Sequence, residues 1–333
     1  MVIGICGMGG TGSDAVLYIL KECKNINVLY EREFLLTYFP DGLEDLEYRL
    51  MNQKARYYSS DIAIKSFKKF SNAICHNEKS YYNKLTDGHF NELVDDYLNN
   101  ITQVKYKGNW MYDDYIFGSV FEKIKYALLK RIKPLKNKVQ RDINFSVNPE
   151  NFYDETSKFL KKVYNYHNIK SDFVIDQAFP GNNPTNSMRL FGKDSKAIVI
   201  VRDPRDVYLT YKRNKERGYT WFPVDTVEDF ITFLKNQYTF DYKNKNILYV
   251  QFEDLVYNYE KTAKKIVKFC GLKPEDHIDK FKYFSPKKSL KNTQRFVSNT
   301  KYAEDIKKIE KEMKDYLYDF SKAKFKEFDE DSY

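Results

Sequence analysis

The chain has 333 residues, of which 42% are hydrophobic and 31% are charged, so it can bury a sizeable core and is neither disordered nor fibrous. It carries 56 Lys and Arg against 47 Asp and Glu, a formal net charge of +9, which indicates an anionic partner without identifying it. Basic and acidic residues are interspersed and form no sustained basic stripe, so we expect no nucleic-acid partner.

The cysteines and the hydropathy exclude further classes. The four cysteines form no CxxC pair, and no Cys/His cluster has the spacing of a zinc site, so we expect neither a disulfide framework nor a metal. No apolar run reaches the roughly 18 to 20 residues of a membrane span, and no charged leader precedes the first apolar run. These patterns predict a cytoplasmic protein without a transmembrane segment.

The N-terminal elements alternate between strand and helix. Val2–Cys6 is a short apolar run bounded by glycines, typical of a buried parallel strand. A glycine-rich turn follows, then a helical pattern at Ala15–Leu20 and a second possible strand at Asn27–Tyr30. From about residue 40 to 165 the patterns are helical and rich in tyrosine, with no clear buried strand.

Strands return in the second half of the chain. Phe173–Ile175, Ala197–Val201 and Ile247–Val250 are short and rich in β-branched residues, with helical patterns between them. Tyr302–Phe320 has the apolar spacing of a C-terminal helix. This alternation predicts an α/β fold, with a central, mostly parallel sheet flanked by helices. We expect one domain over residues 1–333, with residues 40–165 as a large helical insertion.

The glycine-rich turn, Gly7 to Gly12, connects the first strand to the first helix. Such a turn presents backbone N–H groups at the positive end of a helix, where they can bind phosphate or sulfate oxygens. The pattern Gly7-x-Gly9-x-x-Gly12, with Glu31 about 20 residues later, also fits a dinucleotide site and resembles adenylate-forming enzymes. An ordinary P-loop NTPase is disfavoured, because Ser13 and Asp14 stand where its Lys-[Ser/Thr] pair would be. The loop by itself does not choose among these interpretations.

A second motif is more specific. Arg202 follows the strand Ala197–Val201, and Thr210 lies eight residues later, in the first turns of an expected helix. A guanidinium and a hydroxyl placed in this way can bind a phosphate group. The segment from Ala197 to Tyr211 closely resembles the 3′-phosphate-binding motif of sulfotransferases that use PAPS, 3′-phosphoadenosine 5′-phosphosulfate.

Further segments extend this resemblance. Ile247–Leu255 and Val267–Leu272 are similar to the strand, "EDL" and "F-x-G-L" signatures of the family, and Phe252 occupies the position of its adenine-contacting aromatic residue. Residues 285–295 lie where the family has a basic loop over the 3′-phosphate. The resemblance implies a P-loop-like sulfotransferase fold, in which the insertion shapes the acceptor site. It implies donor binding by Gly9, Gly10, Thr11, Gly12, Ser13, Arg202, Thr210, Phe252, Lys291, Asn292 and Arg295.

The resemblance also implies a reaction. A sulfuryl group would pass from PAPS to a hydroxyl or amine, leaving PAP as product, without a metal. Glycan-acting members use a glutamate three residues before an aromatic residue, a spacing matched by Glu31 and Phe34. This match makes Glu31 the first candidate for the base and a saccharide, or another small hydroxyl compound, the expected acceptor. Glu33 and His89 are the other candidate bases.

Two departures leave catalytic competence open. Met8 stands where the family usually has a loop Lys or Arg, and Gln177 lies in a segment where many relatives carry a lysine. Losing a cation at the developing charge could cost about 3 kcal/mol, a hundredfold in rate. Arg32, Arg56 and Arg189 are candidates to replace it. The alternatives are a Rossmann-type NAD-binding or adenylate-forming enzyme and a non-catalytic module that binds PAP or PAPS.

Overall fold

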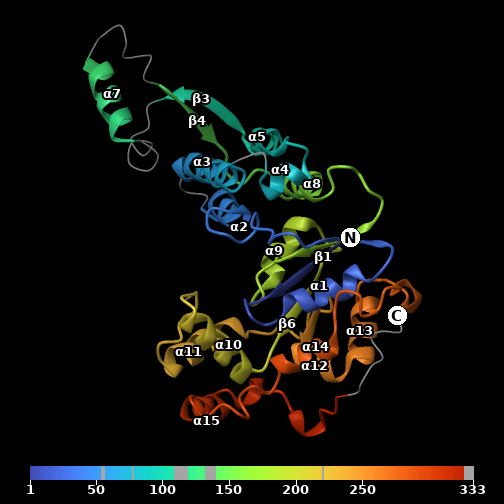
Figure 1. Cartoon of the computed structure of the whole chain (residues 1–333). Helices are drawn as coiled ribbons and strands as arrows, with labels where there is room; N and C mark the ends of the chain where they lie inside the picture. The colour runs from blue at the N-terminus through green and yellow to red at the C-terminus, as the bar shows by residue number, and fades with distance from the viewer. Residues whose placement is uncertain (54–56, 77–78, 109–118, 132–139, 220, 326–333) are drawn as a thin grey trace. The chain divides into compact units, whose positions relative to one another are not determined.

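The computed structural model describes residues 1–53, 57–76, 79–108, 119–131, 140–219 and 221–325. The chain divides into two compact units (Figure 1). We call Met1–Leu35 together with Lys170–Tyr333 the sheet unit, and Leu36–Ile169 the inserted unit. Each is described by itself.

The sheet unit contains a parallel sheet of five strands in its described part, in the order β2-β5-β1-β6-β7. The register pairs Val2 with Phe173 and Ala197 with Ile247. All five predicted strands are present, and the predicted fold class is confirmed. The strands are β1 Val2–Gly7, β2 Ile26–Leu29, β5 Asp172–Asp176, β6 Lys196–Val201 and β7 Ile247–Gln251.

The central strands are apolar on both faces because helices cover both sides of the sheet. On one face, Ile3 and Ile5 of β1 pack with helices α1, Ser13–Lys21, and α13, Tyr259–Phe269. On the other face, Gly4 lies against Phe179, whose ring contacts Phe191 of helix α9, Pro184–Phe191. Figure 1 shows α1 and α9 on opposite sides of β1.

The remaining helices of the sheet unit follow the carboxyl ends of β6 and β7. Asp203 caps α10 by accepting a hydrogen bond from the Arg205 amide at 2.9 Å, and Pro204 occupies the first turn. The bounds are α10 Pro204–Glu216, α11 Val227–Gln237, α12 Phe252–Tyr257, η3 Pro274–Asp276, α14 Pro286–Ser289, η4 Leu290–Asn292, α15 Ala303–Glu312, η5 Lys314–Tyr316 and η6 Phe320–Lys322.

The C-terminal helix is shorter than its apolar spacing predicts. It ends at Glu312 instead of extending to Phe320, although Met313 beyond it is still buried. The backbone then turns, and the Tyr318 amide donates to Asp203 Oδ2 at 3.0 Å. This tertiary hydrogen bond replaces the helical one that the sequence pattern suggests.

The inserted unit is mainly helical, as predicted, around a core in which the rings of Phe67, Tyr97 and Phe159 pack together. It also contains an antiparallel strand pair, β3 Val104–Gly108 and β4 Arg141–Phe145. Because β3 is exposed along most of its length, it lacks the apolar pattern that marks a buried strand. The helices are α2 Leu43–Glu47, η1 Tyr48–Asn52, α3 Tyr57–Ile74, α4 Tyr81–Leu85, α5 Phe90–Ile101, α7 Val120–Arg131 and α8 Phe152–Tyr164.

None of the described helices is long and apolar enough to cross a membrane. The described residues likewise contain no group of three or more His, Cys, Asp or Glu side chains arranged to hold a metal ion.

Candidate active site

The glycine loop lies between the carboxyl end of β1 and the start of α1. Thr11 closes it, because both its amide and its hydroxyl donate to the Met8 carbonyl, at 3.1 and 2.7 Å. Gly10 and Gly12 have φ of +83° and +97°, values that favour glycine. Gly9 and Gly10 are exposed. Gly12 is the N-cap residue of α1, so no side chain caps the first turn of this helix. The loop therefore presents backbone groups and a helix N-terminus suited to an anion.

Arg202 lies directly against this loop. It is only 6% exposed, and its Nη1 donates to the Gly10 carbonyl at 2.8 Å. Its Nη2 donates to the Asn292 carbonyl, so one guanidinium joins the glycine loop to the basic segment, residues 285–295. Its buried Nε has no hydrogen-bond partner among the described residues. A buried unpaired donor on a cation is costly, and an anionic ligand would satisfy it.

Thr210 and Arg295 complete a cationic site beside Arg202. The Thr210 hydroxyl donates to the Asp206 carbonyl at 2.8 Å and lies 3.1 Å from Arg295 Nη1 and 3.4 Å from Arg202 Nη1. Burial and the charges of Arg213 and Arg202 lower the pKa of Arg295. Mutually repelling guanidinium groups around one hydroxyl form a site that an anion such as a phosphate would stabilise.

Asp206 fixes the basic segment to α10. Its two carboxylate oxygens accept the Gln294 and Arg295 amides, both at 2.8 Å. Burial raises the pKa of Asp206 to about 6, against the opposing effect of Arg202. Asp206 is a positioning residue that the sequence motif contains but does not distinguish.

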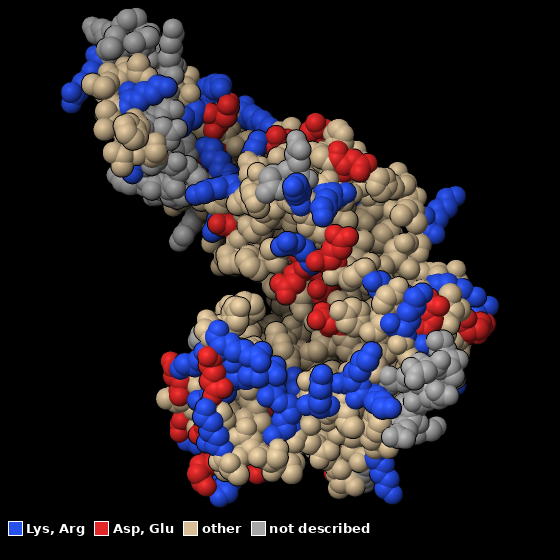
Figure 2. Space-filling view, in the orientation of Figure 1, with Lys and Arg blue, Asp and Glu red and all other residues tan. Residues whose placement is uncertain are grey.

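Phe252 and Asn292, two other predicted donor-binding residues, are connected to the same loop. The Phe252 ring packs against Gly12, where an added Cβ would be 2.6 Å from Phe252 Cδ2, and it lies 5.2 Å from the Arg202 guanidinium. Asn292 contributes its carbonyl, as described above. Lys291, its neighbour in η4, is exposed. Figure 2 shows Lys and Arg side chains gathered over α10 and α14 of the sheet unit.

The candidate bases have different locations. Glu31 and Glu33 are exposed and follow β2 in the sheet unit. His89 belongs to the inserted unit, where its Nδ1 lies 2.7 Å from Glu92 Oε2 and its ring stacks on Tyr166. The structure therefore groups Glu31 and Glu33 with the glycine loop in one unit, and His89 in the other. The role of each as a base stays a prediction.

Asp176 was not among the sequence-derived candidates, although it ends a buried strand next to the glycine loop. It is 7% exposed, and its Oδ1 has no hydrogen-bond partner within the described part of the chain. Burial and the charges of Asp14 and Glu33 raise the pKa of Asp176 to about 7. The next residue, Gln177, has a φ of +50°, and its Nε2 lies 3.5 Å from Ser13 Oγ.

Two of the three candidate replacement cations, Arg32 and Arg189, lie within the described residues. Arg189 donates to Asn186 Oδ1 at 3.1 Å on α9, and Arg32 is exposed. Arg56 lies outside the described residues.

An aromatic cavity of about 280 Å³ adjoins the glycine loop. The rings of Tyr211 and Phe222 stack with centroids 4.4 Å apart, and the Tyr211 hydroxyl donates to the Gly9 carbonyl. Trp221 is 82% exposed at the rim. Aromatic faces of this kind can stack on a sugar ring or another flat group. The lining residues are Tyr211, Asn214, Tyr219, Trp221, Phe222 and Val224.

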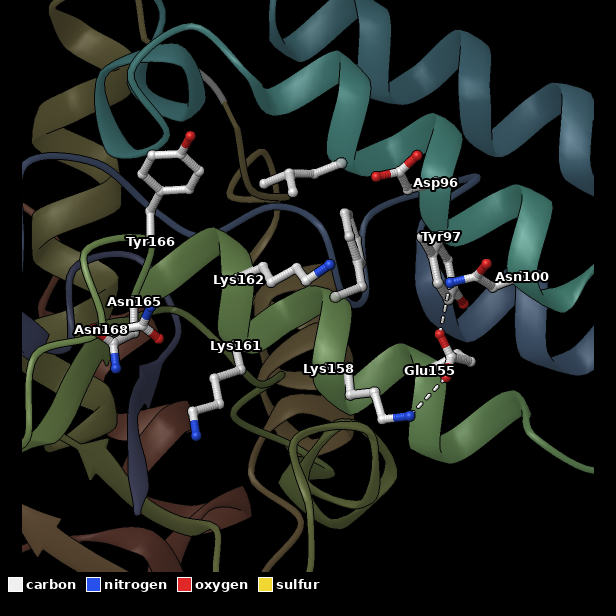
Figure 3. Close-up of a pocket in the computed structure, with 12 residues that line it drawn as sticks. Asp96, Tyr97, Asn100, Glu155, Lys158, Lys161, Lys162, Asn165, Tyr166 and Asn168 are labelled. Atoms are coloured by element: carbon white, nitrogen blue, oxygen red, sulfur yellow. Dashed lines mark hydrogen bonds and ion pairs between the residues drawn. The ribbon is translucent and has the colours of Figure 1, made fainter.

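The inserted unit contains a larger cavity, of about 580 Å³, between α5 and α8 (Figure 3). Tyr97 and Phe159 are its buried aromatic residues. Lys158 and Asn100 both donate to the Glu155 carboxylate, at 2.8 and 2.9 Å. The remaining lining residues are Leu93, Asp96, Lys161, Lys162, Asn165, Tyr166 and Asn168. This mixture of rings, amides and charges suits a ligand with several hydroxyl or anionic groups.

Comparisons with known proteins identify the family. No curated protein matches the chain. Among solved structures, a sulfotransferase domain from the Synechococcus PCC 7002 olefin synthase is similar at 12% identity and a TM-score of 0.37, over 84% of this chain and 76% of that one. A sulfotransferase domain from the curacin biosynthetic pathway is similar at 11% identity and a TM-score of 0.38, over 95% and 98%. The model of the sulfotransferase family matches residues 3–276, and the chain therefore belongs to that family.

Proposed function

We propose that this chain transfers a sulfuryl group from PAPS to a hydroxyl group of an acceptor, with PAP as the second product. The buried Arg202 guanidinium supports this proposal most directly. It contacts the glycine loop, lies beside Thr210 and Arg295, and retains an unpaired Nε in the described structure. A 3′-phosphate would satisfy this donor, while the loop amides and the start of α1 would bind the 5′-phosphosulfate.

The acceptor that we propose is a saccharide. The aromatic cavity next to Gly9 supports this choice, because Trp221 and Tyr219 offer exposed rings beside the proposed sulfuryl position. We also propose that the inserted unit contributes to acceptor specificity, because its cavity between α5 and α8 offers amide, carboxylate and lysine groups for hydroxyl or anionic substituents.

Calorimetry with PAP, NAD and ATP tests the donor. We expect PAP to bind, and Arg202→Ala to lose more than a hundredfold in PAP affinity, because it removes a charged group from a buried phosphate site. Arg217→Ala is the matched control, since Arg217 is an exposed arginine at the end of α10. Binding of NAD without PAP would favour the Rossmann-type alternative and contradict the proposal.

Transfer of labelled sulfate from PAPS to a panel of glycans then tests the reaction. Tight PAP binding without transfer to any acceptor would favour a non-catalytic module, the alternative that Met8 and Gln177 keep open. Transfer only to hydroxyl compounds that are not sugars would support the reaction and contradict the saccharide assignment.

A further inference from the structure

The carboxyl end of β5 and the glycine loop are structurally joined. Asp176 pairs in register with Ile5 of β1, and the Gln177 amide donates to the Ile5 carbonyl at 2.8 Å. The chain then passes Phe179 and brings Gly181 against Gly7, where an added Cβ would lie 3.3 Å from the Gly7 Cα. The segment that begins at Asp176 therefore borders the loop in which we place the phosphosulfate.

The Asp176 carboxyl group has unused hydrogen-bonding capacity. The residue is only 7% exposed, and its Oδ1 has no hydrogen-bond partner among the described residues. A buried carboxylate that serves only the fold is normally satisfied by a cation or by several N–H groups. Asp203 of the same unit shows this contrast, because the Arg205 guanidinium binds both of its oxygens.

Two further carboxylates, on elements next to β5 in space, act electrostatically on Asp176. Asp14 lies in the first turn of α1, and Glu33 precedes Phe34, whose amide donates to the Asp176 carbonyl at 2.9 Å. The buried Cys6 thiol of β1 also lies within electrostatic range. Burial, followed by the charges of Asp14 and Glu33, raises the pKa of Asp176 to about 7. A carboxyl group with such a pKa is well matched to taking up a proton near neutral pH.

We propose that Asp176 is the catalytic base that accepts the proton of the acceptor hydroxyl. The inference rests on the proposed function and assigns a residue within it. The O–H bond of the acceptor breaks, and its oxygen forms the new bond to sulfur. The bond between sulfur and the bridging oxygen of the donor breaks, and PAP leaves with that electron pair. The proton passes to the carboxylate of Asp176. Glu31 and Glu33, both exposed, are then not required for proton transfer.

The pH dependence of kcat/KM for the acceptor tests this assignment. A base must be deprotonated to act, so the wild-type rate should rise with pH through about 7. Asp176→Asn cannot accept the proton. We expect it to lower kcat about a hundredfold or more and to remove the ascending limb of the pH profile, the rise in rate through pH 7. Its PAP affinity should stay at the wild-type value. Its thermal midpoint should match that of the wild type at pH 4 and exceed it at pH 8, because the isosteric amide resembles the protonated carboxyl group.

A second variant tests the base without changing it. Asp14→Asn removes one of the charges that raise the pKa of Asp176, so the ascending limb should move to lower pH. This shift can be measured even if Asp176→Asn does not fold, and an unmoved limb would contradict the assignment. Glu31→Gln is the rival variant, and loss of the limb in Glu31→Gln but not in Asp176→Asn would identify Glu31 as the base.

The remaining outcomes separate the two proposals. An Asp176→Asn protein that keeps the wild-type kcat and pH profile overturns the role of Asp176 and leaves the sulfotransferase reaction intact. A folded wild-type protein that transfers no sulfate from PAPS to any acceptor overturns both.

Discussion

Arg202 and Arg205 lie in the same short motif, yet their guanidinium groups have different environments. The Arg205 guanidinium binds both oxygens of Asp203, at 2.9 and 2.8 Å, and Glu310 at 2.8 Å, and it lies 3.7 Å from the Phe296 ring. All of these contacts are structural. Arg202 instead donates to backbone carbonyls and keeps an unpaired Nε in the described structure. This contrast supports the proposal that Arg202, and not Arg205, binds the donor phosphate.

Gly12 allows a test at the scale of one residue. An alanine there would be strained by the φ of +97°, and its Cβ would lie 2.6 Å from Phe252 Cδ2. We expect Gly12→Ala to lower the free energy of unfolding by about 2–3 kcal/mol and to weaken PAP binding, because the ring and the loop must move apart. Chemical denaturation and calorimetry measure the two effects.

Gly88→Ala is the matched control for Gly12→Ala. Gly88 has a φ of +88°, but nothing lies within 4 Å of its Cβ position. It should therefore report the backbone strain by itself, a cost of about 1 kcal/mol, with PAP affinity unchanged. Equal losses of stability in the two variants would show that the contact with Phe252 does not contribute to the free energy lost in Gly12→Ala.

At the scale of elements, a buried carboxyl group connects the β6–α10 and β7–α12 junctions. Glu253, the second residue of α12, accepts the Asp203 amide at 2.9 Å through Oε1, and its Oε2 has no partner in the described part of the chain. Burial is the main cause that raises the pKa of Glu253 to about 8. Near neutral pH this group is therefore mostly protonated in the folded protein.

This pKa predicts a pH-dependent stability. Because the folded protein binds the proton more tightly than the unfolded chain, the stabilisation is complete below the ordinary pKa of about 4.5 and is lost as pH rises to about 8. Glu253→Gln resembles the protonated acid, so we expect it to match the wild type at pH 4 and to exceed it at pH 8 by roughly 4 kcal/mol. Denaturation at both pH values measures the difference, and parallel pH profiles for the two proteins would contradict the prediction.

The elements also show where sequence patterns are informative. The five parallel strands were predictable because burial on both faces requires short, continuous apolar runs. The exposed strand β3 has no such run, so the apolar pattern does not predict it. Arg202 and Thr210 were predictable because their spacing along one segment brings them together. Asp176, by contrast, could not be predicted, because its raised pKa depends on Asp14 and Glu33, which lie far from it in sequence. Tyr211 could not be predicted either, because only the fold brings its hydroxyl to the Gly9 carbonyl.

At the scale of the whole molecule, the two units contain different candidate binding sites. The sheet unit contains the proposed donor site, and the inserted unit contains its own cavity. In Figure 3, Lys162 extends from α8 toward the α5 side of this cavity, whereas Lys161 points away from it. This orientation supports a role for Lys162 in the proposed contact with the acceptor.

If the inserted unit binds part of the acceptor, Lys162→Ala should raise the KM for the acceptor about tenfold, the effect of losing one charged hydrogen bond. The KM for PAPS should not change. Lys69→Ala on α3 is the control, because Lys69 is exposed and does not line the cavity. Steady-state kinetics with each substrate varied in turn measure both constants, and an unchanged acceptor KM in Lys162→Ala would argue against this role of the cavity.

The strand order has a consequence for biosynthesis. Both neighbours of β1 in the sheet, β5 and β6, follow it by more than 160 residues, since Val2 pairs with Phe173. At a typical translation rate of 5–20 residues per second, β1 and the glycine loop wait roughly 10–30 s for their first strand partner. The inserted unit is completed during this interval, so the nascent chain carries an unpaired apolar strand while its second unit assembles. We therefore expect variants that destabilise the inserted unit to lower the yield of folded protein during synthesis, even where the free energy of unfolding of the finished molecule changes little.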